Sequence, residues 1–364
     1  MPTLEEVFEK YSELLRIKPL IWHKDTKELE WLDTRLLPHR EKYSRSGDYR
    51  RIARAIKDME VRGAPAIGVT AAFGMAAAAY RINASTVEEL LASLQEPYET
   101  LRSTRPTAYN LFYALDRVLD AARKAAAEND VEEVRQAVER EAESIMVEDI
   151  LSNIEMGRYG SKLLEDGMTV LTHCNAGAVA TSGFGTALGV IRYAWYEGKK
   201  ISVIADETRP LLQGARLTVW ELWKEGIPVR LITDNMAGLV LAKGLADAVI
   251  VGADRVIYTG HTANKIGTYM VALSANRAGK PFYVALPTST IQPTMDPGSI
   301  VIEERSPDEV RRVMGELLIT VEDIPVYNFA FDVTPPDLIT AFITEKGVVR
   351  PPYPEGLRRV KEGS

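Results

Sequence analysis

The chain has 364 residues, of which 46% are hydrophobic and 26% are charged, and its formal net charge is −7. This length is too great for one ordinary core, so we expect two domains in a globular, soluble protein. The acidic balance argues against a nucleic-acid-binding surface, and no apolar run approaches the roughly 20 residues that span a bilayer. A single cysteine excludes an internal disulfide and favours a reducing compartment, and the acidic N-terminus does not resemble a signal peptide. We therefore expect a cytoplasmic protein with no nucleic-acid or membrane partner.

The N-terminal part of the sequence predicts helices beside a small antiparallel sheet. Thr3 and Glu6 match a capping box at the start of a first helix. Residues 19–23 and 28–33 are β-rich segments joined by a turn-like stretch, which predicts a hairpin. Asp48 can cap the helix that follows.

A long helix is predicted to begin after Asp130, which forms another cap together with Glu133. Apolar residues keep helical spacing from there nearly to Gly167, so we expect this helix to bridge two domains or to break once in its middle. We place the domain boundary inside it. The N-terminal domain, residues 1–145, would be mainly helical with the small sheet, and residues 146–364 would form a Rossmann-like catalytic domain.

From about residue 168 the pattern changes to short β-rich strands, each followed by a polar corner and most by a helical segment. This alternation predicts an α/β fold with a doubly wound parallel sheet, whose polar corners all lie at one edge. The C-terminal stretch from Arg350 onward is rich in proline, and we expect an extended tail there. The five predicted strands are residues 170–171, 201–205, 229–232, 248–251 and 282–285.

An arginine, a glycine and an alanine precede Pro65 and a helix built of small residues. Because proline suits the first turn of a helix, Arg62, Gly63 and Ala64 are predicted to lie at a helix N-terminus. Free N–H groups, the helix dipole and an arginine together make an anion site, although a tight turn between packed helices would explain the motif equally well. Arg105 precedes another proline-started helix and is a weaker candidate, since most such arginines are simply solvated.

The spacing of the glycines disfavours a dinucleotide site. Gly183 and Gly185 lie between a strand and a helix, and Asp206 follows at about the distance that a dinucleotide fingerprint requires. The glycine pair, however, begins too far beyond the strand for the tight turn, and the third glycine, Gly189, is one position out of register. No P-loop sequence occurs either. We therefore expect no nicotinamide or flavin cofactor.

The histidines do not form a recognisable metal motif. Neither an HxxxH nor a CxxC pair occurs, whereas a catalytic zinc usually needs three protein ligands. We therefore expect no metal site. The four isolated histidines are His23, His39, His173 and His261.

The lone cysteine, Cys174, stands just past the carboxyl end of a predicted strand, between His173 and Asn175. Open α/β sheets place their chemistry at this position, and nearby N–H groups could favour the thiolate. Asp254 occupies the equivalent place after a later strand. The alternatives are a small buried hydrophobic residue for the cysteine and a capping or turn residue for the aspartate.

Asn264 and Lys265 lie in a stretch of small residues that is expected to be a loop opening a helix. An Asn-Lys pair in such a loop can hold a sugar hydroxyl or a phosphate. A solvated loop lysine is the alternative.

Taken together, these motifs resemble the methylthioribose-1-phosphate isomerase family, which is related to the regulatory subunits of translation initiation factor 2B. The resemblance runs from about residue 17 to residue 350. Arg-Gly-Ala, His-Cys-Asn and Ala-Asn-Lys are the discriminating motifs, because the initiation-factor relatives as a group lack the full catalytic set. The motifs occur in the order Ile17-Lys-Pro-Leu-Ile-Trp-His, Val61-Arg-Gly-Ala-Pro-Ala-Ile-Gly, Thr172-His-Cys-Asn-Ala-Gly, Gly185-Thr-Ala-Leu-Gly, Asp206-Glu-Thr-Arg-Pro, Gln213-Gly-Ala-Arg, Gly252-Ala-Asp-Arg, Ala263-Asn-Lys-Ile-Gly-Thr, Ile302-Glu-Glu-Arg and Phe331-Asp-Val-Thr-Pro.

This resemblance implies an aldose–ketose isomerase of methionine salvage, which acts on methylthioribose 1-phosphate, forms a homodimer and needs no cofactor. It implies that Cys174 is the catalytic thiol and that Asp254 is the catalytic acid. It also favours reading the glycines from Gly177 to Gly189 as room for a sugar phosphate close to the backbone. The implied substrate contacts are Arg62, Gly63, Ala64, Arg105, Gln213, Asn264 and Lys265.

The implied reaction explains why two such groups are needed. The anomeric carbon carries phosphate, so the ring cannot open spontaneously to a free aldehyde. Asp254 would protonate the ring oxygen, which near neutral pH requires surroundings that raise the pKa of its carboxyl group, most simply by desolvation. Cys174 would take the C2 proton to give an enol phosphate, or the O2 proton while hydride shifts to C1. Two other functions stay open: isomerisation of 5-deoxyribose 1-phosphate or ribose 1,5-bisphosphate, and a non-catalytic regulatory role.

Overall fold

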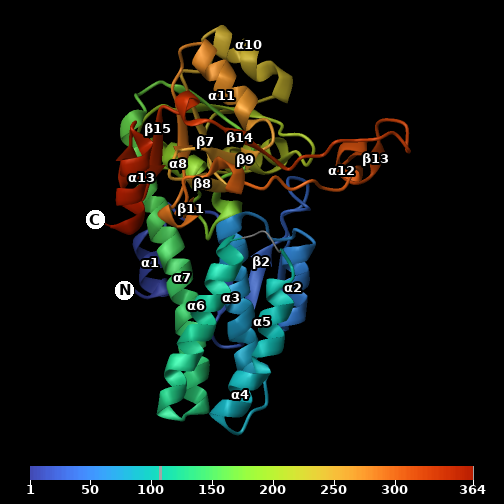
Figure 1. Cartoon of the computed structure of the whole chain (residues 1–364), viewed down its shortest axis with the longest axis vertical. Helices are drawn as coiled ribbons and strands as arrows, with labels where there is room; N and C mark the ends of the chain where they lie inside the picture. Colours follow the sequence, from blue (N-terminus) through green and yellow to red (C-terminus); the bar gives the residue numbers. More distant parts are fainter. Residues whose placement is uncertain (106–108, 364) are drawn as a thin grey trace. The chain divides into compact units, whose positions relative to one another are not determined.

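The computed structural model describes residues 1–105 and 109–363 (Figure 1). The chain forms two compact units. The N-terminal unit consists of Met1–Leu151 and Ala178–Gly185, and the C-terminal unit consists of Ser152–Gly177 and Thr186–Ser364. The predicted boundary between residues 145 and 146 stays a prediction.

The N-terminal unit begins with the predicted capped helix and hairpin. α1 (Leu4–Lys10) carries the capping box, in which the side chain of residue 3 and the carboxylate of residue 6 each accept the other's backbone N–H. β1 (Leu20–His23) and β2 (Glu28–Leu32) form the antiparallel hairpin. β3 (Tyr43–Ser46) pairs with β2 and is absent from the prediction, because its sequence has no apolar alternation.

The helices of this unit include α3 (Ala64–Arg81), the predicted helix of small residues, which is buried along nearly all of its length. It lies so close to α6 (Tyr109–Ala125) that a Cβ on Gly68 would stand 2.8 Å from the carbonyl oxygen of Asn110. Small side chains are therefore what allows the two backbones to approach. The other helices are α2 (Tyr49–Lys57), which Asp48 caps as predicted, α4 (Val87–Ser93) and α5 (Gln95–Arg102).

α7 (Val131–Gly160) is the predicted long helix, and its 30 residues run without a break. Asp130 lies before its first turn, where its carboxylate accepts the N–H of Glu132. The division between the two units falls inside α7, after Leu151.

The C-terminal unit contains the predicted doubly wound parallel sheet, so the predicted fold class is confirmed. Its strand order is β16-β15-β10-β7-β4-β5-β6, and only β16 runs antiparallel to its neighbour. All five predicted strands are present, and the parallel β15 and antiparallel β16 extend the sheet. The strands are β4 (Thr169–Thr172), β5 (Ser202–Asp206), β6 (Val229–Ile232), β7 (Ala248–Val251), β10 (Phe282–Ala285), β15 (Ala341–Thr344) and β16 (Gly347–Val349).

The central strand β4 shows why both faces of this sheet are covered. Val170 packs in a core with residues of α8 (Ala187–Tyr196) and α9 (Val219–Lys224), whereas Leu171 packs in a separate core with residues of α10 (Ala237–Ala242) and α11 (Thr268–Arg277). Successive side chains of a strand point to opposite faces, so the middle of a strand between two helical layers is apolar on both faces.

A second sheet in this unit changes one prediction. β11 (Ile291–Gln292), β8 (Arg255–Ile257), β9 (Thr262–Lys265) and β14 (Phe331–Thr334) lie side by side in that order. Asn264 and Lys265 therefore end a buried strand, and the prediction of a loop there is wrong. β9 pairs with β14, about 70 residues away, as well as with the nearby β8, but its sequence, Thr-Ala-Asn-Lys, has no run of apolar residues that would mark it as a strand.

The predicted extended tail is also wrong, because α13 (Tyr353–Glu362) follows the last strand. Tyr353, Leu357 and Val360 are buried, and the hydroxyl of Tyr353 donates to the carbonyl of Ile339. Prolines disfavour a helix interior but suit its first turn, which is where Pro354 lies. Between β11 and β14 the chain forms α12 (Asp308–Arg311) and a short hairpin of β12 (Arg312–Val313) and β13 (Leu317–Leu318).

None of the described helices combines the length and the low charge that crossing a bilayer would require.

Gly214 begins a single π-helical turn, Gly214–Thr218, that leads into α9. A Cβ at this position would lie 1.7 Å from the carbonyl oxygen of Asp206, so Gly214→Ala should lower the free energy of unfolding by about 3 kcal/mol. Gly238→Ala, inside α10, is the matched control, because its new Cβ would approach Ser274 only to 3.4 Å. That control should be neutral or stabilising by about 0.5–1 kcal/mol, measured for both variants by urea denaturation. Equal stability of the two variants would contradict the prediction.

Candidate active site

The strand order places a topological switch point between β4 and β7. From β4 the chain adds β5 and β6 on one side and then β7, β10 and β15 on the other. Loops diverge at such a point, which is where open α/β sheets bind ligands. Cys174 follows β4 and Asp254 follows β7, and the two strands are direct neighbours, with Leu171 paired to Val249. The structure thus brings the two predicted catalytic residues to adjacent strand ends.

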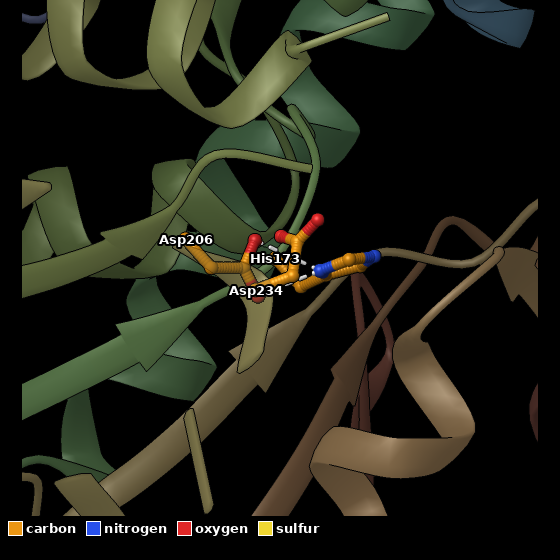
Figure 2. A group of neighbouring side chains, drawn as sticks. All are labelled: His173, Asp206 and Asp234. Atoms are coloured by element: carbon orange, nitrogen blue, oxygen red, sulfur yellow. Dashed lines mark hydrogen bonds and ion pairs between the residues drawn. The ribbon is translucent and has the colours of Figure 1, made fainter. Parts of the chain in front are cut away.

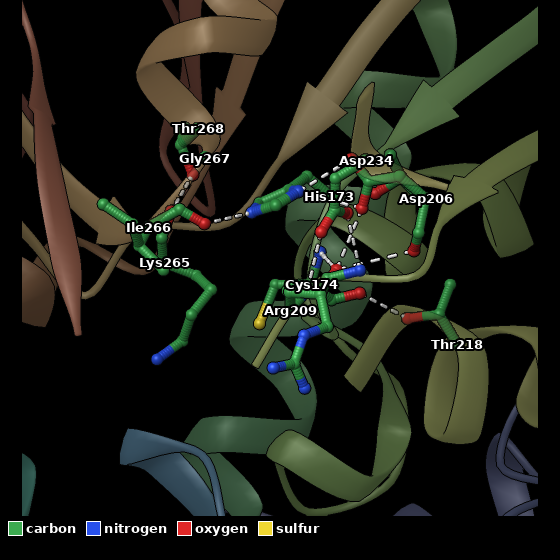
Figure 3. Close-up of polar contacts among 12 residues, drawn as sticks. His173, Cys174, Asp206, Arg209, Thr218, Asp234, Lys265, Ile266, Gly267 and Thr268 are labelled. Atoms are coloured by element: carbon green, nitrogen blue, oxygen red, sulfur yellow. Dashed lines mark hydrogen bonds and ion pairs between the residues drawn. The ribbon is translucent and has the colours of Figure 1, made fainter. Parts of the chain in front are cut away.

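The backbone of Cys174 is held on both sides. Its N–H donates to the hydroxyl oxygen of Thr208 at 2.8 Å, and its carbonyl accepts the hydroxyl of Thr218 at 2.6 Å. The residue adopts a left-handed conformation with φ 64°, which is costly for a residue with a side chain. Cys174 is 8% exposed, and Figure 3 shows Sγ on the same side of the loop as the side-chain ends of Lys265 and Arg209.

Asp254 contrasts with this arrangement because its side chain is exposed. Its N–H donates to the carbonyl of Ala263 at 3.0 Å, which ties the corner after β7 to β9. The general-acid role predicted for Asp254 requires desolvation of its carboxyl group, whereas the residue is exposed in this structure. A bound substrate would have to exclude water from Asp254.

Three predicted substrate residues of the C-terminal unit are buried polar groups. Gln213 is 5% exposed, and its Oε1 has no hydrogen-bond partner among the described residues. A buried amide oxygen without a donor is unfavourable, so a ligand hydroxyl would fit here. Lys265 is 7% exposed, donates from Nζ to the carbonyl of Ala330 at 3.0 Å and lies over the ring of Phe331. Asn264 donates to the hydroxyl of Thr268 at 3.1 Å.

The other predicted substrate residues lie in the N-terminal unit. Gly63 is the N-cap of α3 with φ 93°, so Arg62 and Ala64 flank a helix N-terminus as predicted. A Cβ on Gly63 would lie 2.4 Å from the carbonyl oxygen of Ala180, which shows that this glycine serves close packing. Arg62 and Arg105 are half-buried. Pro106 and Thr107, part of the second predicted arginine motif, lie outside the described residues.

The glycines between residues 177 and 189 need a partial correction. A Cβ on Gly177 would lie 2.2 Å from Oε2 of Glu221, and one on Gly183 would lie 3.1 Å from the carbonyl oxygen of Ile17. The absence of a side chain at these two positions makes room for Glu221 and Ile17 rather than for a ligand.

His173 is a functional candidate that the sequence interpretation missed. Its Nδ1 lies 2.8 and 2.7 Å from the two carboxylate oxygens of Asp206 (Figure 2), and its Nε2 lies 2.9 Å from the carbonyl oxygen of Ile266 (Figure 3). Burial by itself lowers the pKa of His173, but the carboxylate of Asp206 outweighs burial and the pKa is raised. In the sequence, only the acidic segment that begins at Asp206, after the next strand, could have indicated a partner for His173.

One group of three potential metal-ligand side chains lies close together in the part of the chain that the structure describes. The ligand atoms of His173, Asp206 and Asp234 are all within 4.8 Å of one another (Figure 2). These three side chains already form hydrogen bonds with other groups of the protein. The carboxylate of Asp234 accepts the backbone N–H groups of Thr208 and Arg209, both at 2.7 Å, and burial raises the pKa of Asp234. The donors and acceptors are therefore arranged for one another rather than for a cation.

A second buried network supports Asn175. Arg192 of α8 is fully buried and donates to Glu221 of α9 and to Glu225, the C-cap of that helix, both at 2.6 Å. Glu221 also accepts the side-chain amide of Asn175 at 3.0 Å, and that amide lies 3.2 Å from the hydroxyl of Thr218. This network was also missed, although an arginine inside an otherwise apolar helix was its visible signal.

Known proteins resemble this chain over nearly its whole length. Residues 60–351 match the model of the initiation factor 2 subunit family. A methylthioribose-1-phosphate isomerase from Thermosipho melanesiensis is 53% identical, and the match covers 96% of this chain and 99% of that protein. The isomerase of the same name from Acetivibrio thermocellus is 52% identical over 92% of this chain and 97% of its own.

Two solved structures are similar in fold as well as in sequence. The 5-methylthioribose 1-phosphate isomerase from Pyrococcus horikoshii OT3 has a TM-score of 0.92 and 43% identity, covering 97% of this chain and 98% of that chain. The translation initiation factor eIF-2B subunit delta from A. fulgidus has a TM-score of 0.87 and 46% identity, covering 95% and 99%.

Arg192 tests how much the buried network contributes. Arg192→Met should lower the free energy of unfolding by about 3–5 kcal/mol, because it leaves two carboxylates buried without a cation. Adding Glu221→Gln and Glu225→Gln should restore most of this loss in urea denaturation. Arg123→Met, which removes an exposed pair with Asp120, is the control and should change stability little. A triple variant no more stable than Arg192→Met alone would refute this account.

Proposed function

We propose, because this chain belongs to the methylthioribose-1-phosphate isomerase family within the wider initiation factor 2 subunit family, that it is an aldose–ketose isomerase. Its substrate is S-methyl-5-thio-α-D-ribose 1-phosphate, and its product is S-methyl-5-thio-D-ribulose 1-phosphate, a step of methionine salvage. The observation that carries this proposal is the placement of Cys174 and Asp254 at the ends of the adjacent strands β4 and β7.

The reaction needs an acid and a second group that handles a proton. Asp254 protonates the ring oxygen so that the sugar opens, and the substrate itself shields the exposed carboxyl group from water. Cys174 then removes the C2 proton to give an enol phosphate, or removes the O2 proton while hydride moves from C2 to C1. Reaction in D₂O distinguishes the routes, since solvent deuterium at C1 indicates proton transfer, whereas its absence favours a hydride shift.

The remaining residues bind the substrate. Gln213 accepts a hydrogen bond from a sugar hydroxyl through Oε1, the buried oxygen that has no partner in the described structure. Lys265 is suited to the phosphate, because its buried ammonium group carries a positive charge. Asn264 belongs to the same proposed set, and membership of the family implies further substrate contacts at Arg62, Gly63, Ala64 and Arg105. No metal or organic cofactor takes part in the proposed reaction.

A non-catalytic regulatory role is the second candidate. It is favoured by the 46% identity to the A. fulgidus protein, which bears the name of an initiation factor subunit. Cys174 and Asp254 at adjacent strand ends favour the enzyme instead. Absence of turnover on methylthioribose 1-phosphate, 5-deoxyribose 1-phosphate and ribose 1,5-bisphosphate, together with stable co-purification with an initiation factor, would decide for the regulatory role.

We also infer a cytoplasmic homodimer. Several large apolar side chains are exposed on and beside the packed pair α10 and α11, and such a patch is typical of an interaction surface. A sedimentation mass equal to one chain would contradict the dimer. The exposed residues are Met236, Leu239, Leu245, Tyr269, Met270 and Leu273.

Substitutions at the two proposed catalytic residues test the isomerase activity. Cys174→Ser and Asp254→Asn should each lower kcat on methylthioribose 1-phosphate by roughly 10²–10⁴-fold, because each removes a proton-transfer group without changing its size much. Asp120→Asn, on the exposed surface of α6, is the matched control and should retain full activity. The proposal fails if the parent protein does not turn over the substrate, or if both variants match the control.

A further inference from the structure

We propose that His173 is a positioning residue of this site, an imidazolium that donates a hydrogen bond from each ring nitrogen and so joins the Cys174 loop to the segment that follows Lys265. The positioning role rests on the isomerase activity proposed above, whereas the protonation state does not. His173 is 2% exposed, and it lies between β4 and Cys174.

The direction of one hydrogen bond is fixed by its acceptor. Nε2 of His173 lies 2.9 Å from the carbonyl oxygen of Ile266, and a carbonyl oxygen can only accept. Nε2 therefore carries a hydrogen. If the ring were neutral, Nδ1 would present a lone pair to Asp206.

The contacts of Asp206 show which partner holds the second proton. Both of its oxygens are at nearly equal distances from Nδ1, 2.8 and 2.7 Å, and Oδ1 also accepts the hydroxyl of Thr208 at 2.9 Å. A carboxylate suits this role because it accepts at both oxygens, whereas a protonated acid would point one O–H at the ring. Nδ1 therefore donates to an ionised Asp206, and the pair is a buried salt bridge.

Further acidic groups act on the same ring. Asp234, after β6, raises the pKa of His173, and the charge of His173 in turn opposes the effect of burial on Asp332 of β14. Burial raises the pKa of Asp332, whose carboxylate accepts the N–H groups of Gly267 and Tyr269. The carboxylates of Asp206, Asp234 and Asp332, from three elements of one unit, thus act on the ring. Their negative charge explains why the ring stays protonated although it is buried.

The ring also touches the backbone on its far side. A Cβ on Gly267 would lie 2.9 Å from Cε1 of His173, so only glycine lets the chain pass this close. Ile266 and Gly267 directly follow Lys265 and precede α11. On the other side, Thr208 links Asp206 to the N–H of Cys174. One side chain therefore connects the segment bearing the proposed thiol with the segment bearing the proposed phosphate ligand.

Nuclear magnetic resonance of the full chain labelled with ¹⁵N-histidine tests the protonation state without substrate. The four histidine signals are assigned by single His→Gln substitutions. We expect both ring nitrogens of His173 to remain protonated at pH 8, where an ordinary histidine with a pKa near 6.5 is neutral. An unprotonated Nδ1 or Nε2 at that pH would overturn the imidazolium.

Substitutions at both ends of the pair test positioning. His173→Gln can donate from one atom only, so it loses one of the two bonds, and we expect kcat/KM to fall about 100-fold. Asp206→Ala should have a similar effect. Asp206→Asn should recover at least tenfold of that loss, because its amide can donate to Nδ1 of a neutral ring while its oxygen still accepts from Thr208. His39→Gln, at an exposed position, is the control.

The alkylation rate of Cys174, the only thiol of the chain, gives a second readout that needs no substrate. His173→Gln and Asp206→Ala should change this rate at least tenfold, and Asp206→Asn should move it back toward the parent value. A merely structural role predicts lower melting temperatures with unchanged kcat/KM and thiol reactivity in the folded protein, and this result would overturn positioning. A parent protein without isomerase activity would refute the proposed function alone, because the resonance and alkylation results would still decide on His173.

Discussion

The hydroxyl groups of Thr208 and Thr218 form hydrogen bonds with the backbone N–H and carbonyl of Cys174, and the arrangement of the site depends on these two bonds. A left-handed conformation costs about 1–2 kcal/mol for a residue with a side chain, so it persists only where the surroundings impose it. Thr208 is itself left-handed and is fixed by Asp206 and Asp234. Asp206 and Asp234 therefore fix Thr208, and Thr208 in turn fixes the left-handed backbone of Cys174, so the position of the thiol is set by these hydrogen bonds.

Buried charge is the second constraint, and it is met by pairing. Arg192 faces two carboxylates, and His173 faces Asp206. Removing ions from water costs several kcal/mol each, which only close partners offset, so every member of such a network is confined to one position. The proposed catalytic loop lies between the two networks, one reaching it through Thr208 and the other through Asn175 and Thr218. Such a site is organised before substrate arrives.

Two other groups of the C-terminal unit are not part of these networks. Asp254 is exposed, and Oε1 of Gln213 is buried without a donor among the described residues. Both features make sense if the substrate completes the site, by shielding the carboxyl group and by donating a hydroxyl. Binding energy from the sugar and phosphate would then be used to raise the pKa of the acid in the complex, where the proton is needed.

The sequence by itself determined what is encoded over a few residues. The capping box at Thr3, the parallel strands with their polar corners and the placement of Cys174 at a strand end all depend on local spacing, which the chain carries before it folds. The tertiary structure alone decided that β4 and β7 are neighbours, that Asn264 and Lys265 lie in a strand, and that His173 and Arg192 are paired. Those features join residues some 30 to 80 positions apart, and only packing decides which distant partner a strand or a buried charge will meet.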